Sequence, residues 1–405
     1  MRIIADLHIH SRFARATSKY LSIPEIAKWA NIKGINLIGT GDFTHPKWFA
    51  EIEEYLTINA NGFYSLKSGE YPEVFFVPQA EIASIYTQGG KCRRIHTIVI
   101  MPTLKSVKKF NEMLGTRANL YSDGRPITGV PAKYIAKMAI EADPKSLIVP
   151  AHIWTPWFAV LGSKSGFDSI EECFEEEAKN IYAVETGISS DLMMNWQLSM
   201  LDKFTLLSNS DAHSVANLGR EANVFEISEN DFSCDEIFRI IKEKDASKFK
   251  YTIEYFPDEG MYHYDGHRAC GEGIRMAPEE SKKINKICPV CGKEMTIGVM
   301  HRVMDLADRK YGFVPNGATG QKKFMPLDEI ISKSIGKGEK TKTVQEIYNK
   351  FIDKFGAEYP LLLDTDIIEL KKVDERVGEA ILKVRKGELK IEPGYDGTYG
   401  VVEIR

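Results

Sequence analysis

The sequence lacks long apolar runs: no stretch is long enough to cross a bilayer, and the start at Met1 has no secretory pattern. We therefore expect a cytoplasmic protein with no membrane partner. It also lacks an excess of positive charge, because 53 Lys and Arg residues against 57 Asp and Glu residues give a formal net charge of -4. This balance excludes a uniformly basic coat for nucleic acid but leaves a local basic groove open.

Cysteine is scarce as well, with six residues in a chain of 405. Cys92, Cys173 and Cys234 lie far apart, and we interpret them as structural thiols without special chemistry. The other three cysteines cluster between residues 270 and 291. The length, together with 43% hydrophobic and 27% charged residues, predicts a large globular enzyme core with an appended module.

Histidine and acidic residues follow short apolar runs throughout the first half of the chain, and such runs indicate strands. These residues are Asp6, His8, His10, Asp42, His45, Glu81, His96, His152, Asp211 and His213. At the ends of neighbouring strands of a barrel they would gather into a metal site with more than one ion. The alternative for a single histidine such as His96 is a hydrogen-bonded core or surface residue.

Spacing within this set supports a shared site. In a strand, residues two apart point to the same face, so His8 and His10 would share an ion. Asp211 and His213 have the same spacing. Asp6 has the parity of the first pair, and we expect it to orient an imidazole rather than to bind an ion.

The ligand types limit the metal and its chemistry. Imidazole and carboxylate groups without thiolates suit Zn²⁺, Mn²⁺ or Fe, and for a catalytic centre we expect Zn²⁺, Mn²⁺ or Mg²⁺. Clustered ions lower the pKa of a bound water and neutralise charge on a phosphate group. The predicted centre therefore suits the hydrolysis of a phosphoester.

Strands and helices alternate along the same half. The segment from Ser22 to Glu25 has the Ser-x-x-Glu form of a capping box, with a proline in the first turn, and predicts a helix that stops at Gly34. The strand 35–38 then leads to Asp42 and completes a βαβ unit. Further strands are expected at 70–86 and 93–101, joined by a turn at 88–91, and helices at 131–142, 169–179 and 192–201. The pattern predicts an α/β class with a distorted barrel.

The clustered cysteines predict a structural zinc site. Cys288 and Cys291 form a Cys-x-x-Cys pair followed by glycine, and His267 and Cys270 have the same spacing. Three sulfurs and one imidazole make a closed tetrahedral set for Zn²⁺. A redox dithiol is the alternative for the cysteines. The alternatives for the nitrogen ligand are His263 and His301.

The ordered motifs resemble the polymerase and histidinol phosphatase (PHP) superfamily of metal-dependent phosphoesterases over about the first 250 residues. The motifs run from Asp6 to Ser11, through the Gly-Asp element and the strand residues, to Ser210 to His213. The resemblance implies a distorted barrel with His8, His10, Glu81, His96, His152, Asp211 and His213 as ligands. The sequence departs from the superfamily at Asp42 and His45, where a Thr-Asp-His triplet is common. The further histidine that superfamily members have after the His-x-His pair is missing from this sequence, and Arg12 and Arg15 lie nearby instead.

A narrower resemblance covers nearly the whole chain. The segments 39–46 and 184–191, with the cysteine and histidine module, are similar to the endonuclease Q family of this superfamily. This similarity implies a DNA repair endonuclease that hydrolyses the phosphodiester 5′ to deaminated bases (hypoxanthine, uracil, xanthine) and to abasic sites. We expect a barrel over residues 1–256, a zinc module over 257–300, and a mainly helical DNA-binding region over 301–405 that ends in a hairpin near 391–400.

Several residues near the centre are candidates for contact with DNA. Trp154, Trp157 and Phe158 follow His152 and would stack on nucleotides, or else pack a loop onto the barrel. Arg117 and Arg125 lie in a loop that would approach phosphates or remain solvated. Asp191 is a candidate for orienting water, and Arg15 for contacting the scissile phosphate.

Two rival functions remain open at this point. One is a small-molecule phosphatase, although such a substrate requires neither the zinc module nor the long tail. The other is a non-catalytic DNA-binding scaffold, although an inactive barrel would not need so many ligands. We find no glutamine-initiated sliding-clamp peptide at the end of the chain, so clamp binding is left open.

Overall fold

The computed structural model describes residues 1–270 and 273–405. The strands of its core are β1 (Arg2–Asp6), β2 (Leu37–Gly39), β3 (Leu56–Ile58), β4 (Tyr64–Leu66), β5 (Phe75–Val77), β6 (Gln79–Gln88), β7 (Lys91–Ile100), β8 (Ile127–Thr128), β9 (Leu147–Pro150), β10 (Ala183–Glu185), β11 (Thr205–Leu207), β12 (Ala222–Glu226), β13 (Phe249–Glu254) and β16 (Gly320–Lys323). They form sheets in the orders β16-β13-β12-β1-β2-β5-β4-β3, β8-β6-β7-β9 and β10-β11.

Short bridges join these sheets into a distorted barrel. β1, β2 and β5 are parallel neighbours, and Ile148 in β9 bridges to Ile181 just before β10. On the other side, Ile9 after β1 bridges to Ala212 after β11. The carboxyl ends of the parallel strands therefore meet at one end of the barrel, which confirms the predicted fold class.

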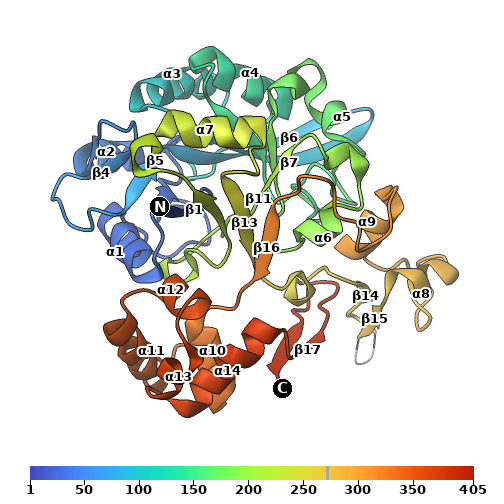
Figure 1. Ribbon diagram of the computed structural model, residues 1–405. Helices are drawn as coiled ribbons and strands as arrows, with labels where there is room; N and C mark the ends of the chain where they lie inside the picture. The colour runs from blue at the N-terminus through green and yellow to red at the C-terminus, as the bar shows by residue number, and fades with distance from the viewer. Residues whose placement is uncertain (271–272) are drawn as a thin grey trace.

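Helices cover the outside of the barrel. They are α1 (Ile23–Lys33), α2 (Pro46–Tyr55), α3 (Leu104–Gly115), α4 (Ala132–Ala142), α5 (Ile170–Phe174), α6 (Leu192–Asn195) and α7 (Cys234–Glu243). α3 and α4 pack against each other over the sheets, and α7 also covers the barrel (Figure 1). Among the described residues, no helix is long and apolar enough to span a membrane.

Local chemistry explains most element boundaries. α1 begins after Ser22 and ends at Gly34, whose φ of 81° is the left-handed conformation that favours glycine. The capping-box prediction is wrong in detail, because the Ser22 side chain makes no capping hydrogen bond. β6 and β7 form the predicted hairpin, and Gly89 and Gly90 both have positive φ, as a tight two-residue turn requires.

Two predicted helices are shorter than expected. In place of a helix over 169–179, α5 ends at Phe174 and a 3-10 helix follows. In place of one over 192–201, α6 stops at Asn195 and a separate 3-10 turn begins at Ser199. The side-chain amide of Asn195 donates to the Ser190 hydroxyl and the Asp191 carbonyl, which fixes the short helix against the preceding loop.

The second half adds a small module, a helical region and a hairpin. Their elements are β14 (Asp265–His267), β15 (Ile274–Met276), α8 (Pro278–Lys283), α9 (Val299–Leu306), α10 (Leu327–Ile335), α11 (Lys342–Phe355), α12 (Glu358–Leu363), α13 (Ile367–Lys371), α14 (Glu375–Lys386), β17 (Leu389–Glu392) and β18 (Val401–Ile404). α10 to α14 lie together, apart from β14, β15 and α8 (Figure 1). The expected boundary at residue 300 falls within α9, and β16 returns to the barrel sheet beside β13. The division into three parts stays a prediction.

A buried ion pair fastens the helical region to the barrel. The Lys33 ammonium at the end of α1 lies 2.7 Å from the Glu358 carboxylate of α12, and both side chains are almost fully buried. Glu358 also accepts hydrogen bonds from the Leu327 amide and the Tyr348 hydroxyl. The Glu358 carboxylate is therefore bound by partners from both the barrel and the helical region.

We predict that Lys33→Ala lowers the free energy of unfolding by about 3 kcal/mol, because it leaves the Glu358 charge buried without its cation. Urea unfolding followed by circular dichroism measures this change. The control is Lys28→Ala in the same helix, whose lysine is exposed beside Glu25 and should cost less than about 1 kcal/mol. Equal stability of the two variants would contradict the role of the pair.

Candidate metal centre

The first ligand group contains His8 and His10, which follow β1, and Asp211, which follows β11. Their side-chain atoms lie within 4.8 Å of one another. The Asp211 Oδ1 atom is 3.0 Å from His10 Nε2 and 3.7 Å from His8 Nε2. The period of two in the extended backbone and the parallel bridge from Ile9 to Ala212 bring the three side chains together.

The second group contains Glu81 in β6, His96 in β7 and His152 after β9. His96 pairs with Ala83 across the antiparallel ladder, which places its side chain on the same face as Glu81. Glu81 Oε1 is 2.7 Å from His96 Nδ1 and 3.2 Å from His152 Nε2. The long β hairpin thus supplies two ligands and β9 supplies the third.

Glu81 connects the two groups. Its Oε2 atom is 3.4 Å from His10 Nε2, and its Oε1 atom is 3.8 Å from His8 Nε2. The carboxylate is fully buried. One acidic side chain is therefore within reach of cations in either group, which is how adjacent ions share a ligand in centres with two metals.

Unpaired atoms in the first group fit a bound cation. Among the described residues, His8 Nε2, His10 Nε2 and Asp211 Oδ1 are buried without a hydrogen-bond partner. The Nδ1 atoms of both histidines are already engaged, by Glu185 and Asp42 respectively. Their Nε2 lone pairs would then face a carboxylate oxygen, and two electron-rich atoms at this separation need a proton or a metal ion between them.

The pKa values reflect the crowding of acids and imidazoles. Burial by itself would lower the pKa of His8, but Glu185 and Asp211 outweigh it and raise that pKa to about 9. Burial lowers the pKa of His96 to about 4, which leaves this imidazole neutral and able to bind a metal. Burial would raise the pKa of Glu81, but His96 and Arg125 hold it well below its usual value. The carboxylates that attract a proton to His8 would equally attract a cation.

Strained backbone surrounds the ligands. Asp42, His152 and Asp211 have φ angles of 38°, 29° and 47°, although none is glycine. Such conformations each cost of order 1–3 kcal/mol and cluster at functional sites. Gly187 has no room for a side chain, because a Cβ atom there would lie 2.5 Å from the His152 Cβ. The loop after β10 is therefore packed directly against a ligand.

Two further carboxylates, Glu185 and Asp6, hold the ligands and one of their loops in place. Glu185 accepts hydrogen bonds from His8 Nδ1, the His152 amide and the Asn209 side chain. The sequence reasoning missed this role, although Glu185 ends a short apolar strand like the ligands themselves. The expectation that Asp6 orients an imidazole is wrong, because its carboxylate accepts from Ser210 and Gly219 and fixes the loop that carries Asp211.

The remaining predicted ligands lie outside both groups. Asp42 accepts hydrogen bonds from His10 Nδ1, at 2.9 Å, and from the Ser11 amide. His45 is the residue before α2, and its ring stacks on Phe13. His213 is partly exposed, with its ring centroid 4.7 Å from that of His10. The structure thus brings six of the nine predicted ligands together and places Asp42 behind one of them.

The cysteine cluster also assembles as a separate group. Ligand atoms of His267, Cys270, Cys288 and Cys291 all lie within 4.8 Å of one another. The His267 Nδ1 atom is 3.3 Å from the sulfurs of Cys270 and Cys291. The alternatives are engaged elsewhere, since His263 faces Asp258 and His301 bonds to Asp265. A tetrahedral metal ion suits this set.

The chain is similar over its whole length to known proteins and solved structures. The protein YqxK of Bacillus subtilis is 31% identical over 99% of both chains. The lesion-specific endonuclease PfuEndoQ of Pyrococcus furiosus is 32% identical, with a TM-score of 0.87 over 100% of this chain and 96% of that one. The chain belongs to the endonuclease Q family.

A second solved structure agrees with this assignment, and further matches cover parts of the chain. An endonuclease Q in complex with a 27-mer duplex substrate with an abasic lesion at the active site has a TM-score of 0.86 and 32% identity. Residues 326–388 match the MJ0043 C-terminal domain family. The protein MJ0043 of Methanocaldococcus jannaschii is 34% identical over 67% of this chain. The matched region spans only 34% of the length of MJ0043.

The structure separates the three aromatic residues that were expected to contact DNA. Trp154 is buried, and its indole N–H donates to the Asn195 side chain, so it packs the core as in the alternative reading. Trp157 is 37% exposed. The Phe158 ring lies 4.6 Å from that of His96 and supports a ligand. Only Trp157 of the three is exposed enough to stack on a nucleotide.

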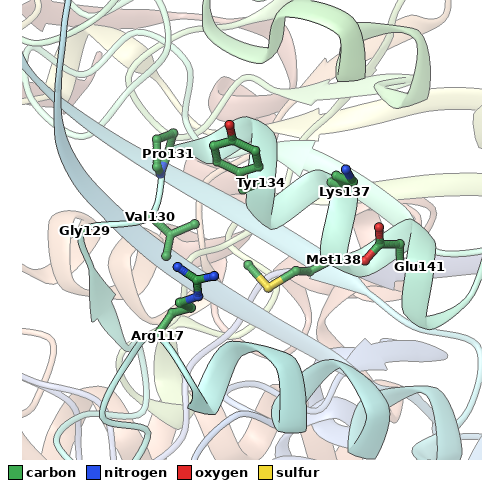
Figure 2. Close-up of a pocket in the computed structure, with 8 residues that line it drawn as sticks. All are labelled: Arg117, Gly129, Val130, Pro131, Tyr134, Lys137, Met138 and Glu141. Atoms are coloured by element: carbon green, nitrogen blue, oxygen red, sulfur yellow. The ribbon is translucent and has the colours of Figure 1, made fainter.

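The two predicted arginines also differ. Arg125 reaches the centre, where its guanidinium donates to Glu81 at 3.0 Å. Arg117 is exposed and lines a pocket of about 750 Å³ against α4, with Tyr134, Lys137 and Glu141 among its walls (Figure 2). None of the metal-centre residues lines this pocket, so only Arg125 contacts the site directly.

Two polar candidates lie near the centre without joining it. The Asp191 carboxylate caps α6 through the Met194 amide and pairs with Lys323 at 2.6 Å. Arg15 is exposed on the loop after His10, and its backbone amide donates to Asp123. Their catalytic roles stay predictions.

We predict that Glu185→Gln weakens metal binding by about 10- to 100-fold, since residues that orient ligands typically contribute that much. The variant keeps an acceptor for His8 but loses the charge that raises its pKa. Calorimetric titration of the metal-free protein with Mn²⁺ measures the affinity. Glu176→Gln changes an exposed glutamate and should leave the affinity unchanged; the same affinity in both variants would refute the role.

Proposed function

We propose that this protein is a lesion-specific DNA repair endonuclease that hydrolyses phosphodiesters with the help of divalent metal ions. The observation that carries the proposal is the six-ligand centre around Glu81 in a chain that matches a lesion-specific endonuclease over its full length. A damaged DNA duplex is the substrate. The finer specificity, for the bond 5′ to deaminated bases and abasic sites, rests on the family resemblance and on the abasic duplex bound by a relative.

The residues of the chain divide the work of the reaction. His8, His10 and Asp211 would hold one ion and Glu81, His96 and His152 another. When bound, such ions supply an activated water and neutralise the charge of the phosphate group. Glu185 and Asp42 keep Nδ1 of His8 and His10 protonated, so that their Nε2 atoms face the ions. Arg125, already beside Glu81, supplies a fixed positive charge for a phosphate oxygen.

The identities of the ions follow from donor chemistry. Imidazole and carboxylate ligands suit Zn²⁺, Mn²⁺ or Fe, and we expect Zn²⁺, Mn²⁺ or Mg²⁺ in the catalytic centre. The cysteine cluster suits structural Zn²⁺. Burial opposes a charged Cys288, but the amides of Cys291 and Val290 and the His267 ring stabilise its thiolate and lower its pKa to about 6. A thiolate at neutral pH is the form that binds zinc.

We predict that the protein nicks a duplex with one abasic site in Mn²⁺ or Mg²⁺ and that Glu81→Gln slows nicking at least ~10³-fold, because both groups lose a shared ligand. Gel electrophoresis of end-labelled DNA measures the rate, and duplexes with hypoxanthine or uracil test the finer specificity. Glu112→Gln alters an exposed residue of α3 and should nick normally.

The outcomes discriminate among the candidate functions. If the wild type cuts no lesion duplex, the proposal is wrong. Release of phosphate from small monoesters alone would indicate a phosphatase. Binding of the lesion duplex without nicking would indicate a scaffold.

For the cysteine cluster we predict that Cys288→Ser removes one zinc ion per chain, because three ligands bind Zn²⁺ far less tightly than a closed tetrahedral set. Inductively coupled plasma mass spectrometry of the purified proteins measures the content. Cys92→Ser changes an exposed cysteine outside the cluster and should keep the full complement. An unchanged zinc content in Cys288→Ser would exclude the assignment.

A further inference from the structure

Three aromatic side chains form a stack beside the metal centre. The rings of Phe13 and His45 are parallel within 19°, with centroids 4.4 Å apart. The Tyr121 ring meets His45 edge-on, with centroids 6.3 Å apart. His45 is 5% exposed and Tyr121 is 68% exposed. We call Phe13, His45 and Tyr121 the aromatic shelf; His45 is buried, Phe13 is partly buried, and the outer ring, Tyr121, faces solvent.

The shelf is attached to a residue that positions a metal ligand. The His45 amide donates to the Asp42 carbonyl at 3.0 Å. The Asp42 carboxylate accepts from His10 Nδ1 at 2.9 Å. Asp42 therefore links the backbone of the shelf to His10, one of the grouped ligands.

The loop that carries Tyr121 is fixed on both sides of that residue. The Tyr121 amide donates to the Asn119 side chain. The Gly124 amide donates to the Phe13 carbonyl, and the Thr44 hydroxyl donates to the Gly124 carbonyl. Gly124 packs so closely that a Cβ atom would lie 2.5 Å from an Asp42 carboxylate oxygen. An exposed ring on a fixed loop costs little entropy when it binds a flat partner.

The charge beside the shelf suits a nucleic-acid strand. The loop after His10 carries Arg12 and Arg15, of which Arg12 pairs with Glu51. Among the described residues, no carboxylate pairs with the exposed Arg15 side chain. The Arg15 backbone amide donates to Asp123, two residues after Tyr121 in the sequence, so Arg15 and the exposed ring lie on adjoining loops. A cation and an exposed aromatic ring together suit the phosphate and the base of one strand.

We propose that Tyr121 stacks on a nucleobase adjacent to the lesion in the strand that is cut, with His45 and Phe13 as its support. The proposal rests on the proposed function and adds a substrate contact to the same site. His45, predicted as a metal ligand, would then serve to hold the stacking ring. Because every base has an aromatic face, this contact would add affinity without reading the sequence.

The test combines two variants with a change in the DNA. Duplexes with one abasic site carry thymine, or its saturated form 5,6-dihydrothymine, at each of the positions that flank the lesion. Dihydrothymine keeps the pairing groups but loses the flat ring. Single-turnover nicking at increasing enzyme concentration gives the half-saturating concentration and the rate at saturation for each duplex.

At one flanking position, we expect dihydrothymine to raise the half-saturating concentration of the wild type about tenfold, as loss of one base stack would. Tyr121→Leu should raise the half-saturating concentration about tenfold for the thymine duplex. Replacing that thymine with dihydrothymine should then have no further effect on the variant. The rate at saturation should change less than about twofold, and Tyr121→Phe should behave like the wild type, because the ring is retained.

The control variant is Tyr55→Leu, which alters a partly exposed tyrosine at the far end of α2, about 15 Å along the helix from His45. Normal nicking by Tyr121→Leu at every concentration would overturn the proposal. So would a ratio of half-saturating concentrations, Tyr121→Leu to wild type, that is equal for thymine and dihydrothymine duplexes at both flanking positions. Absence of nicking by the wild type would instead reject the proposed function itself.

Discussion

The buried carboxylate of Glu81 is the constraint on which the rest of the centre depends. A charged group without solvent is stable only beside compensating groups. Here the compensation comes from three strands and a loop, through His10, His96, His152 and Arg125. The barrel must therefore close accurately for this charge to be satisfied. The contacts that close the barrel are thus the same contacts that assemble the centre.

The acids behind the ligands extend the same logic. Asp6, Asp42 and Glu185 are buried, and each accepts hydrogen bonds from backbone amides as well as side chains. Amide donors are fixed by the fold, so they hold each carboxylate in one orientation. This rigidity offsets the strained backbone at Asp211 and His152. The strain persists because the surrounding bonds determine the loops more strongly than local preference does.

The sequence was sufficient to predict that six of the candidate ligands gather in space, and much less so for the residues around them. A ligand such as His8 can be read locally, since it follows an apolar run and has a partner two residues away. Glu185 lies 177 residues from His8, and no local pattern relates the two. Trp154 could not be separated from Trp157, because burial depends on tertiary packing rather than on residue type. The helix expected over 192–201 breaks after Asn195, whose side chain accepts from Trp154 in a distant part of the chain and donates to the loop before the helix.

The second half of the chain is connected to the loops of the centre by charge. β16 returns to the barrel and places Lys323 against Asp191, on the loop that follows Glu185. Asp191 also caps α6, so both of its oxygens are occupied. Each carboxylate oxygen keeps a further lone pair, so Asp191 can accept from a water molecule while it holds Lys323. The position of Asp191 therefore depends on how β16, and with it the C-terminal half, packs on the barrel.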